Sequence, residues 1–491
     1  VKYIYTKEGR LEKKAEYIDF DDLDEKNEYN EKEFRAETRY SYNKSGNLIK
    51  EISPLGFEKD YYYDAAGRLV QVTEDSEDTR QAAKVTLYKY NKCGNVVKVT
   101  DCNGKEINYE YDVMKRVIRI KDKDGGITRI FYDSKGNPVK YVTPENYDEK
   151  KDDGAGTVID YDSLNRIKEV KNPFGDVIKK NKYNEYGELE KVTDALGFST
   201  RYTYDLGGRR ESVITPEAEK LNKVSQRLSY DAASNITGIT DGEGNKTNYV
   251  LDLWGRIKRI EKAEGSSENY GYDYAGNITS TEDGNGHTIE YGYNSLNKVS
   301  VIKDQMGFKE YFKYDRQGRM VKSKDRNDIN VDYSYNSWDK LIRRRTIGAD
   351  GIADMYGYNK DGTLSFGINK NIGYDYEYTG GGKLKSKKSK GKTLLEYEYN
   401  KDGKVSSIKD AGNRKITYKY DIAGRIKEVW NGKKKDAEYR YNKDSTISRV
   451  ELGNGIVISY GYDRDKNVTG ILAKNAAGNT IFNYKYEYDA N

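Results

Sequence analysis

The side chains that most often carry enzyme chemistry are scarce in this sequence and lie far apart. The chain holds one histidine, His287, and two cysteines, Cys93 and Cys102. A Ser–His–Asp or Cys–His site needs a histidine beside a nucleophile and an orienting acid, whereas His287 lies in the glycine-rich stretch EDGNGHT. A zinc site needs several such ligands close together, and these residues do not cluster. The sequence therefore predicts no catalytic residue and no zinc site, and His287 is interpreted as an exposed turn residue.

Aspartates are abundant, and they could in principle serve calcium binding or glycoside hydrolysis. Turns such as Asp122-Lys-Asp124-Gly and Asp241-Gly-Glu243-Gly could give oxygens to calcium, but calcium needs six to eight converging oxygens. Glycoside hydrolysis needs two carboxylates at a set distance in a cleft, and no non-repeating acidic cluster singles out such a pair. We expect the turn aspartates to accept backbone N–H hydrogen bonds instead, without metal or cofactor.

The residues that recur regularly define the architecture that would position any site. Of the 491 residues, 48 are tyrosine. A tyrosine followed by Asp or Asn returns every 21 residues from Tyr272 to Tyr335 and again from Tyr399 to Tyr462. A fixed period over nearly the whole chain indicates a repeat protein in which each unit packs on its neighbours. The regular tyrosines also argue against disorder, although 34% of the residues are charged.

Each repeat has the pattern of a β-hairpin. Ile107, Tyr109 and Tyr111 alternate with polar residues, which is the period of a half-buried strand. Each repeat carries two turns of the form Asp/Asn-x-x-Gly, in which glycine supplies the positive φ of a G1 bulge. The sequence predicts an all-β protein of tandem hairpins, each about 21 residues long, that form a long antiparallel ribbon.

A ribbon of this length is not expected to stay flat. About forty strands would extend roughly 200 Å, with a width of only about 20–25 Å. Because sheets twist and uncovered edges favour aggregation, we expect the ribbon to coil into a spiral or barrel-like shell. The apolar-Gly-Phe motifs that end at Phe57, Phe198 and Phe308 should then pack between successive turns of the spiral rather than bind a partner.

The residues that define the repeat are predicted to hold it together rather than to react. A buried tyrosine contributes apolar area while its hydroxyl needs a polar partner, and equivalent tyrosines should stack as a ladder. The arginine after each glycine should stack on tyrosine or pair with the turn aspartate. The predicted structural residues are Tyr63, Asp64, Gly67, Arg68, Tyr111, Asp112, Tyr204, Asp205, Gly208, Arg209, Tyr314, Asp315, Gly318, Arg319, Tyr420, Asp421, Gly424 and Arg425.

A single repeat array is predicted to occupy residues 1–491, as a fragment of a longer chain. Residues 1–41 are an irregular first repeat with an acidic insertion at Asp19–Glu25, and residues 42–491 are the regular repeats. Three charged insertions could form single helical turns on the surface. They lie at residues 76–84, 144–152 and 216–226.

The repeated phrase Tyr-x-Tyr-Asp-x-x-Gly-Arg-Leu/Ile resembles the YD repeats of the Rhs (rearrangement hotspot) family. Tyr61–Leu69, Tyr418–Ile426 and Tyr202–Arg209 follow it closely, and about twenty copies span essentially the whole chain. Relatives include shell components of insecticidal toxin complexes, wall-associated polymorphic toxins and teneurins. The resemblance implies hairpins wound into a shell, which in the toxin members encloses a C-terminal effector. It also implies a secreted or bacterial cell-surface protein.

The toxin members cleave themselves at Asp-Pro-x-Gly-type segments after the repeats. None of the five prolines here follows an aspartate, so no catalytic residue is carried over and no effector is expected within this chain. We expect a monomeric, non-enzymatic shell whose partner is its own C-terminal effector. The alternative is an adhesin that binds cell-surface glycans through tyrosine faces. The balance of 86 basic and 81 acidic residues argues against nucleic acid as a partner, and no apolar run is long enough for a transmembrane helix.

Overall fold

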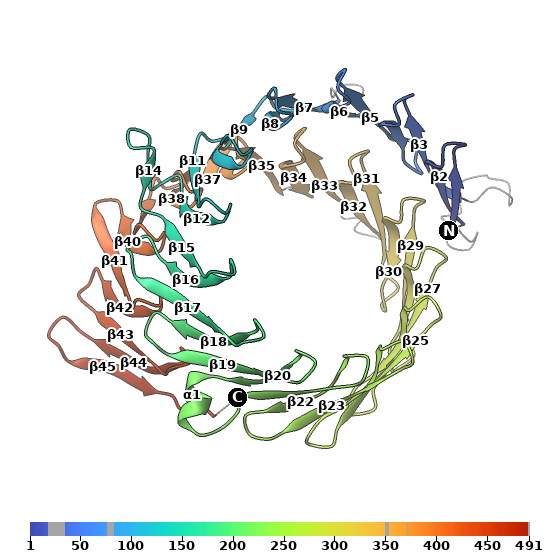
Figure 1. Ribbon diagram of the computed structural model, residues 1–491. Coiled ribbons are helices and arrows are strands. Elements are labelled where there is room, and N and C mark those ends of the chain that lie inside the picture. The colour runs from blue at the N-terminus through green and yellow to red at the C-terminus, as the bar shows by residue number, and fades with distance from the viewer. Residues whose placement is uncertain (18–34, 76–82, 349–352, 371, 490–491) are drawn as a thin grey trace. The chain divides into compact units, whose positions relative to one another are not determined.

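The computed structural model describes residues 1–17, 35–75, 83–348, 353–370 and 372–489. The described residues form 45 strands and one short helix, α1 (Pro216–Lys220). Of these strands, 43 belong to one antiparallel sheet, while β13 (Tyr147–Asp148) and β14 (Asp153–Gly154) pair separately. The predicted all-β class is confirmed (Figure 1). The acidic insertion at Asp19–Glu25 lies outside the described residues.

The hairpins form as their turn residues predict. Strands β5 (Glu58–Tyr63) and β6 (Leu69–Glu74) are joined by the turn from Asp64 to Arg68. The N–H of Gly67 donates to the carbonyl oxygen of Asp64 at 2.9 Å, and the N–H of Asp64 donates to the carbonyl oxygen of Arg68 at 3.0 Å. Gly67 has φ +76°, and the register shifts beside Tyr63. These features confirm a turn with a positive-φ bulge.

Turns alternate between the two edges of the ribbon. One set begins at the residue after each anchor tyrosine, as at Asp64, and we call the edge that carries it the YD edge. The other set joins the hairpins on the opposite edge, as at Asp101 between β8 (Val96–Thr100) and β9 (Glu106–Tyr111). Every repeat therefore places one turn on each edge.

The described chain divides into two compact units. The first contains Val1–Arg116, Asp122–Asp124 and Asn269–Leu394, and the second contains Val117–Lys121, Gly125–Glu268 and Leu395–Asn491. Within each unit an early run of hairpins contacts a late run that follows more than a hundred residues later in the chain. The early run of the second unit includes β15 (Thr157–Tyr161), β16 (Ile167–Lys171), β17 (Val177–Tyr183), β18 (Leu189–Asp194), β19 (Ser199–Tyr204), β20 (Arg210–Ile214), β21 (Gln226–Tyr230), β22 (Ile236–Asp241), β23 (Lys246–Leu251) and β24 (Ile257–Glu261).

The fully buried apolar residues are few and mostly small. Ala15, Ala218 and Ala473 are at most 1% exposed, and Val142 is fully buried. Most strand residues are only half-buried, because a ribbon one sheet thick has no second layer to cover its faces. Stability must therefore come from contacts that repeat along the ribbon, rather than from one central core.

The insertions differ from one another in structure. Residues 216–226 begin with α1, as predicted; Thr215 caps it by accepting a hydrogen bond from the N–H of Ala218. The prediction of a helical turn is wrong for residues 144–152, which instead contribute to the β13–β14 hairpin. The backbone of this hairpin packs so closely on Val142 that a Cβ added at Gly154 would lie 2.9 Å from it. Of the third insertion, residues 76–82 lie outside the described residues. Among the described residues, no helix is long and apolar enough to cross a membrane.

Candidate functional site

The repeat motif builds the same side-chain unit at several YD turns. Asp64 accepts hydrogen bonds from the backbone N–H of Arg68 at 3.0 Å and from its Nε at 2.7 Å. The Arg68 guanidinium lies 4.9 Å from the ring centre of Tyr90, the next anchor tyrosine. Its Nη1 donates to the carbonyl oxygen of Asn91 at 3.3 Å. One arginine thus joins its own turn to the turn that follows. The same arrangement of aspartate, arginine and next tyrosine holds for Asp205, Arg209 and Tyr230, for Asp315, Arg319 and Tyr335, and for Asp421, Arg425 and Tyr441.

The hydroxyl of each predicted tyrosine binds the main chain of the preceding repeat. Tyr63 donates to the carbonyl oxygen of Leu48 at 2.8 Å, 15 residues earlier. Tyr111, Tyr204, Tyr314 and Tyr420 make the same bond with the same separation. Burial raises the pKa of Tyr111, Tyr314 and Tyr420. These hydroxyls therefore stay protonated and serve as donors.

These hydrogen bonds and ring contacts show which side chains of the motif lie next to one another. The Asp, Gly and Arg of one turn lie together, but their arginine reaches the tyrosine of the next repeat rather than its own. The sequence prediction offered arginine–tyrosine stacking and aspartate pairing as alternatives, and both occur together. The expected ladder of tyrosines is corrected, because guanidinium groups cover the anchor rings at four of the motif turns. The anchor tyrosine follows each of these arginines by 16 to 22 residues, and this spacing was the available signal.

The turn carboxylates are occupied by hydrogen bonds. The side chain and backbone N–H of Arg68 lower the pKa of Asp64, and the backbone and side chain of Arg209 do the same for Asp205. At Asp241, considered above for calcium, the carboxylate accepts from the N–H groups of Glu243 and Asn245 and from the Asn245 side chain. Across the described ranges, no three His, Cys, Asp or Glu residues lie close enough to hold a metal ion.

In the second unit, the early and late runs are joined by reciprocal carboxylate–backbone bonds. Asp402 accepts from the N–H of Glu145 at 2.8 Å, while Glu145 accepts from the N–H of Lys401 at 3.0 Å. The same exchange recurs farther along. Asp465 accepts from the N–H of Glu217 at 3.0 Å, and Glu217 accepts from the N–H of Arg464 at 3.0 Å. We call the line of contacts between the early and late runs of a unit the seam.

The first unit has a seam of similar chemistry. Asp124 accepts from the N–H of Gly381 at 2.7 Å and from Nζ of Lys383 at 2.8 Å. Burial alone would raise the pKa of Asp124, but these hydrogen bonds outweigh it and lower the pKa. The indole N–H of Trp338 donates to the carbonyl oxygen of Asp75 at 3.2 Å. The seam was not found from the sequence, since it joins residues about 250–280 apart that share no motif.

Two of the three apolar-Gly-Phe motifs place their phenylalanine at the seam, where packing between turns of the ribbon was predicted. The Phe57 ring lies 6.0 Å from the guanidinium of Arg319 in the first unit. The Phe198 ring lies 5.7 Å from that of Arg464 in the second unit. Both phenylalanines therefore pack between runs. Phe308 is 53% exposed, so the prediction is wrong for this residue.

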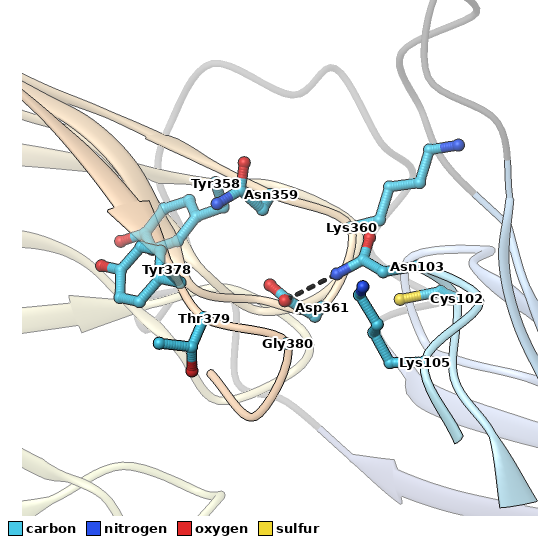
Figure 2. A pocket seen from close by; sticks show the side chains of 10 residues that line it. All are labelled: Cys102, Asn103, Lys105, Tyr358, Asn359, Lys360, Asp361, Tyr378, Thr379 and Gly380. Carbon is cyan, nitrogen blue, oxygen red and sulfur yellow. Dashed lines mark hydrogen bonds between the residues drawn. The ribbon is translucent and has the colours of Figure 1, made fainter. Parts of the chain in front are cut away.

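A polar cavity of about 740 Å³ lies along the first unit's seam (Figure 2). Asn103 donates to Asp361 at 2.7 Å from one run to the other. Burial and the Asp101 carboxylate raise the pKa of the Cys102 thiol, which is the opposite of what a nucleophilic cysteine requires. The other lining residues are turn residues and the anchor tyrosines that end β33 (Ala353–Tyr358) and β35 (Ile372–Tyr378). They are Lys105, Tyr358, Asn359, Lys360, Tyr378, Thr379 and Gly380.

His287 and Cys93 are not among the residues that line this cavity. His287 has a half-exposed side chain, as predicted, and its Nδ1 lies 3.0 Å from Asp283 in its own turn. It occupies the place that arginine takes in the YD turns. Cys93 and Cys102 are both free thiols. The recurring feature of this chain is therefore a set of turn contacts between successive repeats and seam contacts between runs, which we call the lattice. Its contacts join one part of the polypeptide to another.

Comparison with known families agrees with this lattice. Residues 110–244, 219–374, 283–418 and 375–487 match the family described as Teneurin YD-shell. Residues 42–79 and 90–127 match the RHS Repeat. The YD-shell matches together span residues 110–487, which is more than half of the chain. No curated protein matches the chain.

Solved structures share the fold at low sequence identity. The TcdB2-TccC3-Cdc42 crystal structure matches with a TM-score of 0.67 and 15% identity over 96% of this chain and 31% of its own. The Tc holotoxin pore of Photorhabdus luminescens matches with a TM-score of 0.55 and 14% identity, over 98% of this chain and 29% of its own. This chain thus spans about a third of the length of those it resembles. Together with the repeat lattice, the matches show that the chain belongs to the teneurin YD-shell family and carries RHS repeats.

Proposed function

We propose that this chain is a non-enzymatic wall segment of an Rhs-type polymorphic toxin, whose shell encloses and delivers an effector carried C-terminal to the repeats. The protein would be secreted, as a delivered toxin requires. The solved chains of similar fold come from Tc toxin assemblies, which supports a toxin shell over the other roles of the family.

The observation that carries this proposal is the seam. A glycan-binding adhesin needs only the aspartate, arginine and tyrosine contacts that join successive repeats of one ribbon. A container also needs neighbouring runs of the ribbon to be joined edge to edge. The reciprocal bonds of Glu145 with Asp402 and of Glu217 with Asp465 do this within the second unit. The donors are main-chain N–H groups and the acceptors are carboxylates on the two edges, so these joins do not depend on the side chains that line the faces of the sheet.

The glycan-binding alternative draws less support from the geometry. Sugar rings stack on free aromatic faces, but the rings of Tyr90, Tyr230 and Tyr441 are covered by guanidinium groups. Their hydroxyls are bound to carbonyl oxygens as well. The motif tyrosines are thus used by the fold itself.

Limited proteolysis of the native polypeptide that contains this chain tests the proposal. We expect the segment C-terminal to the repeats to resist protease in the intact protein and to be digested when expressed alone. The double variant Asp402→Ala, Asp465→Ala should expose it. Asp283→Ala, which removes a turn carboxylate outside the seam contacts, is the matched control and should leave the protection intact.

Two results would count against enclosure. If the C-terminal segment is digested equally fast with and without the repeats, the shell role fails. If protection is unchanged in the seam variant while hydrogen exchange shows that the seam has opened, protection does not come from the wall.

A further inference from the structure

Positive charge is concentrated on one face of five neighbouring strands in the first unit. The strands are β28 (Val299–Lys303), β29 (Lys309–Tyr314), β30 (Met320–Lys324), β31 (Asn330–Tyr335) and β32 (Leu341–Ile347) (Figure 1). Residues that pair directly in an antiparallel sheet share a face, so the register of the strands shows which side chains lie together. The face holds seven basic residues and is called the basic face below. They are Lys303, Lys309, Lys313, Lys322, Lys324, Arg343 and Arg345.

Acidic residues are nearly absent from the basic face. Within the five strands this face carries one acid, Asp332, whereas the opposite face carries one acid and one base, Glu310 and Arg344. Lys303 and Lys324 form ion pairs with acids that lie outside the five strands. The basic face therefore keeps a net positive charge.

Like charges lie opposite one another within the basic face. Lys313 pairs directly with Lys322 in the register of β29 and β30, and such a pair destabilises an antiparallel sheet. The same ribbon can place opposite charges at paired positions, since Lys50 pairs with Asp60 and its Nζ lies 3.3 Å from that carboxylate. The like charges are therefore not imposed by the repeat, which indicates a surface that an anionic ligand neutralises.

The basic face is open to a ligand. Lys309, Arg343 and Arg345 are exposed, and Tyr311, which pairs with Lys324, is 44% exposed. The seam contacts described above lie between turns at the edges of the ribbon. A further stretch of ribbon that joined in the same way would leave this face uncovered.

The arrangement of charges fits a long anion better than a small one. Five strands about 4.8 Å apart spread the charges over roughly 20 Å, so a small anion would meet only a few of them. Tyr311 lies between Lys309 and Lys313 on this face of β29. There its ring can stack on a sugar ring while the neighbouring cations bind acidic groups. Tyr311 is not one of the anchor tyrosines, whose rings and hydroxyls the fold uses.

Other polyanions fit the basic face less well. Proteins that bind single-stranded nucleic acid stack successive bases on several aromatic side chains, and Tyr311 is the single aromatic residue on this face of the five strands. An acidic polypeptide offers carboxylates but no sugar ring for Tyr311.

We propose that the basic face binds an acidic polysaccharide, a glycan whose sugars carry carboxylate or sulfate groups. The acidic groups bind the lysine and arginine side chains, and one sugar ring stacks on Tyr311. This binding is independent of the enclosed effector proposed above and does not require the ribbon to close into a shell.

Calorimetric titration of the chain with polygalacturonate, a polymer with one carboxylate per sugar, tests the proposal. We expect saturable binding that weakens as salt is added, because salt screens exposed charges. The triple variant Lys309→Gln, Lys313→Gln, Arg343→Gln should lower the affinity roughly tenfold or more, as the loss of three exposed ion pairs implies. Because the variant also removes like-charge repulsion, its melting temperature should not fall.

The matched control is the triple variant Lys7→Gln, Lys44→Gln, Lys92→Gln. These lysines are exposed turn residues of the same unit. Their replacement changes the net charge by the same amount and leaves the basic face intact. The affinity should stay nearly unchanged at physiological salt, where exposed charges more than about 8 Å apart are largely screened.

Tyr311→Leu separates a glycan from other polyanions. The variant keeps an apolar side chain on the strand, so the fold should be retained. It should weaken binding of polygalacturonate about threefold or more through the lost ring contact. Binding of polyglutamate, which has a similar charge per residue but no sugar ring, should not change.

Four results would overturn the proposal. They are no binding of polygalacturonate even at low salt, undiminished binding by the basic-face triple variant, equal losses for polygalacturonate and polyglutamate in Tyr311→Leu, and tighter binding of single-stranded DNA than of polygalacturonate.

Discussion

Asp402 and Glu145 cap each other's backbone across the second unit. The Asp402 carboxylate accepts the N–H of Glu145 at 2.8 Å, and the Glu145 carboxylate accepts the N–H of Lys401, the residue before Asp402. The two acids are 257 residues apart. Turns that are remote in sequence thus hold each other through main-chain donors, which every turn possesses, rather than through matched pairs of side chains.

Removing this carboxylate should loosen the seam without unfolding the hairpins. We expect Asp402→Ala to speed amide hydrogen exchange at Glu145 by about fivefold, which corresponds to the loss of about 1 kcal/mol at a partly exposed hydrogen bond. Asp410→Ala is the control, because Asp410 caps only its own turn. Equal effects of the two variants at Glu145 would show that the inter-run bond contributes nothing.

The arginine of the lattice should be irreplaceable by lysine. Arg425 pairs with Asp421 and lies 4.4 Å from the Tyr441 ring and 5.4 Å from the Phe174 ring. Lysine lacks the planar fork that serves several partners at once. We expect Arg425→Lys to lower the free energy of unfolding by about 1–2 kcal/mol in chemical denaturation.

Arg414→Lys is the control for this substitution. Arg414 also pairs with the aspartate of its own turn, but its side chain is 66% exposed. Its replacement should change stability by less than about 0.5 kcal/mol, as for exposed ion pairs in general. Comparable losses in both variants would contradict a special role of the lattice.

The anchor hydroxyl can be tested by removing a single atom. Tyr441 donates to the carbonyl oxygen of Ile426 at 2.7 Å, and burial raises its pKa. Tyr441→Phe leaves that carbonyl without its donor and should cost about 1 kcal/mol in the free energy of unfolding. Tyr186→Phe, at a residue that is 80% exposed, should cost nothing measurable by thermal denaturation.

Much of this architecture could be predicted from the sequence, because the information is local. The Asp-x-x-Gly turn at Asp64, the strand alternation and the polar partner of Tyr63 all follow from neighbouring residues. The seam could not be predicted, since Glu145 and Asp402 have no shared motif and their meeting depends on how far the ribbon coils per repeat. The exposed apolar turn residue Leu206 could not be recognised either, because it is apolar like many strand residues and only its 110% exposure in the structure distinguishes it.

Turns that have another residue in place of the positive-φ glycine allow a substitution that should stabilise the protein. Lys115 stands where Gly67 stands in its own turn, and it adopts φ +64°. Side chains with a Cβ are strained in this region, whereas glycine is not. We expect Lys115→Gly to raise stability by about 0.5–1 kcal/mol, and Gly67→Val, at φ +76°, to lower it by about 1–3 kcal/mol. Opposite signs in thermal denaturation confirm the turn geometry; equal signs contradict it.

Acid should weaken the lattice. Hydrogen bonds from arginine lower the pKa of Asp64, Asp112 and Asp162 in the folded chain. The stabilisation these carboxylates provide is fully present above the unfolded pKa of about 3.9. It is lost as the pH falls further, through the lowered folded values. Denaturant midpoints measured between neutral pH and about pH 2 should therefore be nearly level until about pH 4 and then fall. A midpoint that rose on acidification would contradict this.

The hydrogen bond from each anchor tyrosine hydroxyl joins residues that are close in sequence, which allows the ribbon to fold while it is being synthesised. Tyr63 binds a carbonyl only 15 residues behind it, so each hairpin finds its partner in polypeptide that has just been synthesised. A ribosome adds roughly 5–20 residues per second, whereas a hairpin forms in about 1–10 μs. The ribbon can therefore grow from its N-terminus at the pace of translation. Edge-to-edge closure waits until the ribosome has added the roughly 250 residues that separate the seam partners.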